Sequence, residues 1–307
     1  MSLALSQTGQ MTDSQPSQFT GFAAAWIIVF IWSFWLLVSR VAAGSGLTIY
    51  DLAAMRYGLA ALVAVPLSLY YKPWRNMTLK QVAVLSFILG PLYILCVFAG
   101  FLFAPAAHGG IFMNGVLPLV SILIGGAIFG ARPTARQGIG AVLILISAIV
   151  LALNGNVTAG PEAWIGDLLF LVGACFFSLY IVLSERWQLG AMQIIFCGTV
   201  VNAVIYLPIW ALWLPSGIAE APLDALILQG VYQGFVPNLI GLLFIAHASR
   251  RIGNANTSSI LAAVPGTGGL LGAVILGEHL TPIGILALMT LTAGLLIAVR
   301  RKRRPPI

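Results

Sequence analysis

The amino-acid sequence predicts an all-α integral membrane protein with ten transmembrane helices, arranged as two five-helix repeats of inverted orientation. Three observations predict this fold. The chain of 307 residues is 60% hydrophobic and only 7% charged, its apolar runs have membrane-spanning length, and prolines, glycines and serines recur at matched positions in the two halves. Since a soluble domain is about 25% charged, so few charges cannot cover a water-soluble surface.

The first element is a polar segment, residues 1–21, which we expect to form a cytoplasmic tail. It carries no Lys or Arg, so it lacks the basic region of a signal peptide, and the apolar run that follows is retained as a span. A bilayer core of about 30 Å requires roughly 20 apolar residues per helix. The predicted spans are residues 22–41, 52–71, 81–103, 109–129, 134–153, 164–183, 191–213, 223–247, 256–276 and 281–299.

The charges predict the orientation of these spans. With both termini in the cytoplasm, every Lys and Arg lies on the cytoplasmic side except Arg40 and Arg56, which are expected to flank the first outer loop. The acidic residues expected on the outer side are Asp51, Glu162, Glu220, Asp224 and Glu278. This distribution follows the positive-inside rule and supports an even number of spans.

The net charge of +7 therefore does not indicate a nucleic-acid partner. The basic run at residues 300–304 is interpreted as an anchor next to the last span. Cys96, Cys175 and Cys197 all lie inside apolar segments without a CxxC or Cys/His cluster. No disulfide framework, metal site or cofactor is predicted.

Matched positions in the two halves predict an internal duplication. The matches are Ser33 and Ser39 with Ser178 and Ser184 at an offset of 145 residues, Pro66 and Pro73 with Pro208 and Pro215 at 142, Pro91 with Pro237 at 146, and Pro118, Gly130 and Thr134 with Pro265, Gly277 and Thr281 at 147. Because each copy contains an odd number of spans, the second enters the membrane from the opposite side. Such inverted repeats can expose one site alternately to either side of the membrane, although some channels also contain them.

The duplication predicts the domain organisation. The parts are a cytoplasmic tail (1–21), a first repeat (22–153), an outer linker (154–163), a second repeat (164–299) and a cytoplasmic basic tail (300–307).

Two matched segments carry a resemblance to a known family. GGIFMNGVLPLVSILIGGAIFGARPTARQGIG and NTSSILAAVPGTGGLLGAVILGEHLTPIG resemble the fourth-to-fifth-helix signature of EamA-type repeats in the drug/metabolite transporter superfamily. The second segment has Glu278 in its GEHLTP turn, as the family commonly does, whereas the first has Ala131 there. The resemblance covers about residues 22–299, and the chain looks most like bacterial exporters of aromatic amino acids and of cations such as methyl viologen.

The resemblance implies that spans 1, 3, 4, 6, 8 and 9 surround a central cavity and that the others are peripheral. It also implies a secondary transporter of small organic metabolites in a bacterial inner membrane, with the lipid bilayer and a small-molecule substrate as partners. We expect it to act as a monomer.

Polar and aromatic residues near the middle of these spans are the candidates for substrate binding. They are Trp32, Ser33, Tyr93, Asn114, Phe177, Ser178, Tyr232, Gln233, Asn238 and Ser259. An amide in hydrocarbon must find a partner, and aromatic rings can stack on a ligand or attract a cation. Packing against other helices or lipid is the alternative for each aromatic residue.

Four prolines near mid-span are candidate gates, because proline removes a backbone donor and frees a carbonyl. They are Pro91, Pro118, Pro237 and Pro265, and an ordinary packed kink is the alternative for each. His108 and His279 are expected in outer loops, and His247, near the inner end of the eighth span, is a weak candidate for proton coupling. No acidic residue is expected at mid-membrane, which disfavours tight proton coupling and leaves facilitated transport or exchange open.

The motifs of other protein classes are missing from the sequence. It contains no HExxH, GxSxG or GxxxxGKS/T motif and no paired intramembrane aspartates, so we expect no enzyme and no fused ATPase. A channel stays open as an alternative, and a purely structural scaffold would give the inverted symmetry no evident purpose.

Overall fold

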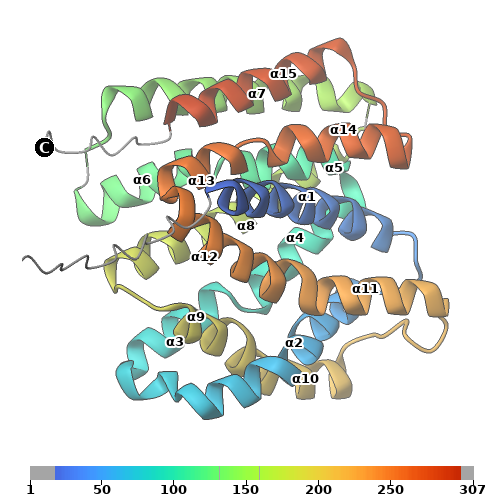
Figure 1. Ribbon diagram of the computed structural model, residues 1–307. Helices are drawn as coiled ribbons and strands as arrows, with labels where there is room; N and C mark the ends of the chain where they lie inside the picture. The colour runs from blue at the N-terminus through green and yellow to red at the C-terminus, as the bar shows by residue number, and fades with distance from the viewer. Residues whose placement is uncertain (1–17, 131, 159, 299–307) are drawn as a thin grey trace, which may run out of the picture.

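The computed structural model describes residues 18–130, 132–158 and 160–298, and these residues form a bundle of helices (Figure 1). Nine of the described helical segments are long and apolar enough to cross a membrane, and the tenth apolar segment, α15, has 17 residues. The prediction of an all-helical membrane protein is confirmed. The basic tail at 300–307 and most of the polar tail at 1–21 lie outside the described residues.

The first half of the chain contains α1 to α7. The helices are α1 (Gln18–Ala42), α2 (Ile49–Tyr71), η1 (Pro73–Asn76), α3 (Leu79–Ile88), α4 (Pro91–Phe103), α5 (Ala106–Gly109), η2 (Gly110–Gly115), α6 (Leu117–Phe129) and α7 (Ala135–Thr158). The second half contains α8 (Ala163–Arg186), α9 (Ala191–Ile195), η3 (Phe196–Val201), α10 (Asn202–Trp213), α11 (Leu223–Phe235), η4 (Val236–Ile240), α12 (Gly241–Ile252), α13 (Asn254–Leu261), α14 (Val264–Leu276) and α15 (Pro282–Ala298).

Several spans are interrupted, and the four candidate gate prolines lie at interruptions. Pro91 is the first residue of α4, while Pro118, Pro265 and Pro237 are the second residues of α6, α14 and η4. A proline fits the start of a helix because its missing N–H would have no partner there, whereas in the interior it disrupts the preceding turn. The prolines thus set the positions of the breaks, and their role in gating stays a prediction.

Matched positions in the two halves perform the same structural task. Gly130 and Gly277 end α6 and α14 with φ of +64° and +67°, a left-handed conformation that favours glycine. Thr134 and Thr281 then cap the following helices, accepting hydrogen bonds from the backbone N–H three residues later. These equivalent helix ends support the duplication that the sequence predicts.

Two serines at matched positions join the halves to each other. The Ser33 hydroxyl of α1 donates to the Val264 carbonyl at 3.2 Å, and the Ser178 hydroxyl of α8 donates to the Leu117 carbonyl at 3.3 Å. Both serines are fully buried. In each case the acceptor directly precedes a helix-breaking proline, so each half satisfies a carbonyl at the break of the other half.

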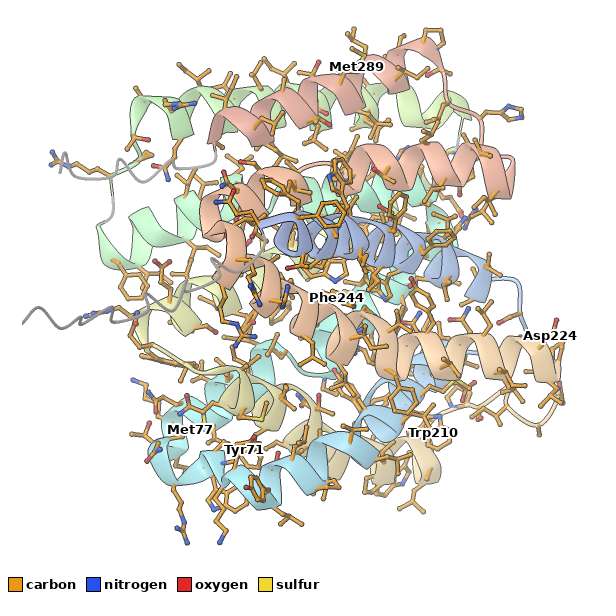
Figure 2. The ribbon with its side chains drawn as sticks, viewed as in Figure 1. Tyr71, Met77, Trp210, Asp224, Phe244 and Met289 are labelled. Carbon is orange, nitrogen blue, oxygen red and sulfur yellow. The ribbon has the colours of Figure 1, made fainter. Side chains whose placement is uncertain are left out.

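The helices form a packed centre and a peripheral rim. Helix α1 contacts α12, α13 and α14, and α4 packs on α8. Helices α7 and α15 pair along one edge of the bundle (Figure 1), where Gly140 and Gly294 let the two backbones approach closely. Met289 of α15, labelled in Figure 2, is 65% exposed at this edge, as is usual for a lipid-facing side chain.

His108 does not lie in an outer loop, as the sequence suggested. Helix α4 ends at Phe103 and α5 already begins at Ala106, so His108 is helical and buried. Its Nδ1 lies 2.7 Å from a carboxylate oxygen of Asp167 in α8. This buried pair connects the first half of the chain to the second.

Breaking the buried pair is expected to destabilise the protein. Asp167→Leu leaves His108 buried without its partner, and we expect a loss of about 3 kcal/mol of stability. The double variant His108→Phe, Asp167→Leu removes both polar groups and should recover most of this loss. Thermal unfolding in detergent, followed by tryptophan fluorescence, measures both. Glu220→Gln, at an exposed acid on the same side, serves as the control, and an unchanged melting temperature for Asp167→Leu contradicts the expectation.

Candidate functional site

A central cavity lies between helices of both halves. Its wall consists of Trp32, Trp35, Arg56, Tyr57, Leu89, Tyr93, Met113, Asn114, Leu117, Phe177, Tyr180, Ile194, Ile195, Gly198, Thr199, Pro237, Asn238 and Leu239. The cavity offers about 160 Å³ to the centres of water-sized molecules. Since one water needs about 10–15 Å³ on this measure, the space suits an organic molecule with the bulk of roughly ten waters.

Three π-helical segments shape this wall. Met113 and Asn114 come from η2, Gly198 and Thr199 from η3, and Asn238 from η4. A π-helical turn contains an additional residue relative to an α-helical turn, so it changes the face that the following side chains present, and such turns are frequent at functional sites. The interrupted spans therefore place amides and a hydroxyl on the cavity wall.

Aromatic side chains form much of the remaining wall. The rings of Tyr93 and Phe177 lie 5.9 Å apart between centroids at an interplanar angle of 31°, and those of Phe177 and Tyr180 lie 5.1 Å apart at 63°. Trp32 and Tyr57 also line the cavity. Faces and edges of rings at these separations favour a planar, aromatic ligand.

Arg56 is the one charged side chain that the described residues place on the wall. It follows the first residue of α2 by seven positions, which is roughly 10 Å along the helix axis. It is half-buried and close enough to Tyr57 and Tyr93 to act on them electrostatically. A charge at such depth is costly unless it faces a cavity and has a function there.

Sequence reasoning missed Arg56 by starting the second span at residue 52, which put this arginine only about one helical turn from the outer loop. The structure starts α2 at Ile49, where Thr48 and Asp51 form a capping box. The Thr48-x-x-Asp51 spacing is a helix-start signal and could have identified the deeper position of Arg56.

Five of the predicted site residues line the cavity. They are Trp32, Tyr93, Asn114, Phe177 and Asn238. Pro237, one of the candidate gates, also lies on the wall, whereas Pro91, Pro118 and Pro265 do not. The role of the five residues in binding a substrate stays a prediction.

Gln233 and Tyr232, which were expected to line the cavity, are not part of its wall in this conformation, and their role in substrate binding stays a prediction. Gln233 is fully buried and accepts a hydrogen bond from Trp35 Nε1 at 2.8 Å, while its amide donates to Ser39 Oγ at 3.1 Å. The Tyr232 hydroxyl donates to the Ile31 carbonyl at 2.8 Å. Both side chains join α11 to α1, because this face of α11 is turned toward α1.

Ser33, Ser178 and Ser259 also lie outside the cavity. The first two use their hydroxyls in the bonds between the halves, and Ser259 belongs to α13. His247 lies outside the cavity too, with its Nε2 3.2 Å from Thr20 Oγ1. Its role in proton coupling stays a prediction.

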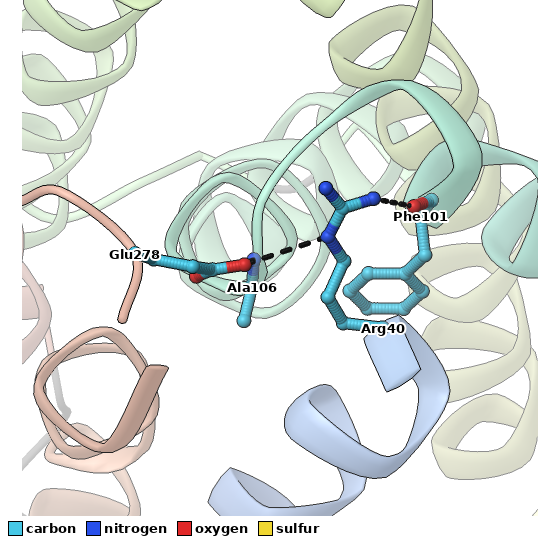
Figure 3. Close-up of polar contacts among 4 residues, drawn as sticks. All are labelled: Arg40, Phe101, Ala106 and Glu278. Carbon is cyan, nitrogen blue, oxygen red and sulfur yellow. Dashed lines mark hydrogen bonds and ion pairs between the residues drawn. The ribbon is translucent and has the colours of Figure 1, made fainter. Parts of the chain in front are cut away.

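An ion pair lies near the ends of α1 and α14, and Figure 3 shows its two residues with their neighbours. Arg40 Nε lies 3.5 Å from a carboxylate oxygen of Glu278, and Arg40 also donates to the Phe101 carbonyl. The Ala106 N–H donates to both Glu278 oxygens at 3.1 Å. We call this cluster the Arg40–Glu278 link. It joins Glu278, just after α14, to three elements of the first half.

Gly272 makes room for this link. A Cβ atom at Gly272 would lie 2.7 Å from Glu278 Oε2, closer than a carbon and an oxygen can approach without displacement. The Glu278 N–H in turn donates to the Gly272 carbonyl at 3.2 Å. The small-residue face of α14 therefore positions the carboxylate as well as packing helices.

The wall of the cavity carries aromatic rings, amides, hydroxyls and one guanidinium, which are groups for binding. Among the described residues, no group of three or more His, Cys, Asp or Glu side chains could hold a metal ion. The arrangement is suited to holding a small molecule between two halves of a helix bundle.

Comparisons with known proteins agree with this arrangement. Residues 19–153 and 164–300 each match the EamA-like transporter family. No curated protein matches the chain. A solved structure described only as "Crystal structure of protein" is 20% identical, with a TM-score of 0.61 over 92% of this chain and 97% of that chain, which shows a shared fold. Since the two family matches cover most of the sequence, the chain contains two EamA repeats and belongs to the EamA-like transporter family.

Proposed function

We propose that the protein carries small organic molecules with an aromatic ring by alternating access, and that the central cavity is its substrate site. As a member of its family the chain is a secondary transporter of small molecules and not an enzyme. The observation that carries the substrate class is the row of neighbouring aromatic rings, tilted and edge-on to one another, on the cavity wall between the two halves. Aromatic amino acids are the first substrates to test, because their size suits the cavity.

Organic cations such as methyl viologen are the less favoured substrates. The guanidinium of Arg56 on the wall repels a cation, and the described wall carries no carboxylate to compensate it. The aromatic rings alone would attract a cation weakly.

The orientation that we propose follows from the charge pattern, and the location and the direction of transport follow from the resemblance to bacterial exporters. Both termini lie in the cytoplasm of a bacterial cell, the protein spans the inner membrane, and transport is export. The start of α1 and the end of α15 lie at one end of the bundle (left in Figure 1), which we call the terminal face. A single chain surrounds the cavity, which supports a monomer as the functional unit.

The Arg40–Glu278 link lies on the other side of the cavity from the terminal face. Trp35 and Trp32 precede Arg40 by five and eight residues in α1, roughly 8 Å and 12 Å along the helix axis. The cavity residues of α9 and η3 lie near the start of their span, which begins at the terminal face. A conformation closed on the outer side and loading from the cytoplasm accounts for these positions.

The matched positions on the terminal face suggest how the opposite conformation closes. The offset of 145 residues pairs Arg40 with Glu185, and the offset of 147 pairs Glu278 with Ala131, next to Arg132. Glu185 and Arg132 are exposed, and the described ion pairs include neither. In our proposal these two residues approach each other when the outer side opens.

Removing an aromatic ring from the wall is expected to weaken substrate binding. Phe177→Ala removes the ring that lies between those of Tyr93 and Tyr180. An aromatic contact with the ligand worth about 0.5–1.5 kcal/mol corresponds to a rise in KM of about twofold to thirteenfold. Uptake of labelled phenylalanine, tyrosine and tryptophan into proteoliposomes measures this effect. Tyr70→Ala, at an exposed tyrosine of α2, is the matched control and should leave KM unchanged.

The same assay distinguishes a carrier from a channel. A carrier saturates and is stimulated by substrate on the opposite side, whereas flux that rises linearly with concentration and shows no counter-exchange favours a channel. If no compound of a broad aromatic panel crosses the membrane, the proposed function is wrong.

The Arg40–Glu278 link is the proposed outer closure, and the approach of Arg132 to Glu185 is the proposed inner closure. Weakening the first and weakening the second should shift the conformational equilibrium in opposite directions. Glu278→Gln removes the ion pair with Arg40 and should favour opening of the outer side, whereas Glu185→Gln should disfavour it. Labelling of Ala104→Cys, which is fully buried near the link, by an impermeant maleimide reports the opening in a background without Cys96, Cys175 and Cys197. We expect labelling several-fold faster with Glu278→Gln and slower with Glu185→Gln.

Glu220→Gln is the control for this experiment, since Glu220 is an exposed acid outside both closures. Equal labelling rates in all four proteins contradict the assignment of the Arg40–Glu278 link as the outer closure.

A further inference from the structure

The central cavity carries a positive charge that no acidic residue of its described wall balances. Arg56 contributes one positive charge to the wall, and the other polar groups of the described wall, among them Asn114, Thr199 and Asn238, are neutral. A cavity with a net charge of +1 in a low-dielectric surrounding attracts an anion, and it favours a monoanion over a molecule without net charge.

The carboxylate nearest to Arg56 along α2 does not neutralise it. Asp51 accepts hydrogen bonds from Thr48 and from Trp210 Nε1 and the Gly217 N–H, at 2.9 Å and 2.8 Å for the last two. These partners hold Asp51 toward α10 and the loop after it, and they account for both carboxylate oxygens. Asp51 therefore acts as an anchor for α10.

The described residues contain no other counterion for Arg56. Their ion pairs are the Arg40–Glu278 link and the His108–Asp167 pair, and Arg56 belongs to neither. A guanidinium roughly 10 Å inside a membrane helix is costly without a partner, so a ligand that supplies a carboxylate would remove much of this cost.

The surroundings of Arg56 offer a position for the carboxylate of such a ligand and another for its aromatic ring. A guanidinium binds a carboxylate through two parallel hydrogen bonds. Arg56 and Tyr93 both line the cavity, and Tyr93 contacts Phe177 ring to ring. A molecule that binds Arg56 with its carboxylate therefore has aromatic faces within reach for its ring. The Asn114 amide makes no hydrogen bond to another described residue, and it can donate to or accept from a neutral substituent of the ligand.

We propose that the preferred substrates are aromatic monocarboxylates, such as aromatic 2-hydroxy or 2-oxo acids, with a net charge of −1. This inference rests on the proposed function and narrows it. An aromatic amino acid shares the ring and the carboxylate but brings an ammonium group, for which the described wall has no carboxylate. An aromatic amine lacks the group that Arg56 binds and adds a like charge.

Three ligands of one skeleton test the inference. They are 3-phenyllactate, a monoanion, L-phenylalanine, a zwitterion, and phenethylamine, a cation. Binding to the purified full-length protein is measured by tryptophan fluorescence and calorimetry, and each compound also competes for uptake in proteoliposomes. We expect 3-phenyllactate to bind about tenfold more tightly than phenylalanine, because the ammonium group of phenylalanine loses water without finding a carboxylate on the described wall. Phenethylamine, which also lacks the carboxylate, should bind most weakly.

Variants of Arg56 supply the second arm. Arg56→Gln should weaken 3-phenyllactate binding about tenfold or more and bring the three affinities together, while Arg56→Lys should keep part of the preference. Arg75→Gln, at an exposed arginine of η1, is the matched control and should leave the order of affinities unchanged.

The outcomes separate the two proposals. If phenethylamine or phenylalanine binds as tightly as 3-phenyllactate, or if Arg56→Gln leaves the order unchanged, the monocarboxylate preference is wrong and the aromatic carrier stands. If the folded protein neither binds nor transports any of the three, the proposed function itself is wrong. Should Arg56→Gln fail to fold, the order of the three ligands on the unmodified protein decides.

Discussion

The interior of a bilayer offers no water to backbone groups, so every interruption of a membrane helix must be satisfied by the protein itself. This constraint explains why the interrupted spans meet at the centre of the bundle. There the hydroxyl of Ser33 reaches the carbonyl before the break in the ninth span, and Ser178 does the same for the fourth. Each half can hold an irregular backbone because the other half supplies the donor. The cavity exists where these irregular segments face one another.

The number of spans and the duplication were predictable because both depend on patterns that run over many residues. Hydropathy averages over a whole span, and the offsets of Pro118, Gly130 and Thr134 repeat in the second half. The direction of a single side chain depends on the rotation of its helix, which the hydropathy of an all-apolar span does not reveal. Gln233 and Tyr232 were therefore assigned to the cavity although they face α1, and the pairing of His108 with Asp167 across the halves left no sequence signal.

Helix α2 shows how two charges in one span can have different tasks. Asp51, in the first turn, is surrounded by donors from its own cap, from α10 and from the following loop, so its charge is used within the fold. Arg56 lies beyond it on the cavity wall, which Tyr57 and Tyr93 also line. A membrane protein retains a costly charge of the second kind where a ligand uses it. The contrast between the two residues is visible only once their partners are known.

The Arg40–Glu278 link takes its base from the first half and its acid from the second, and the first half has Ala131 where the second has Glu278. Two identical copies of either half could not form it, so fusion into one chain allowed the two faces to diverge. Under the proposed cycle different side chains close the two sides, so symmetry no longer requires the two end states to have equal free energy.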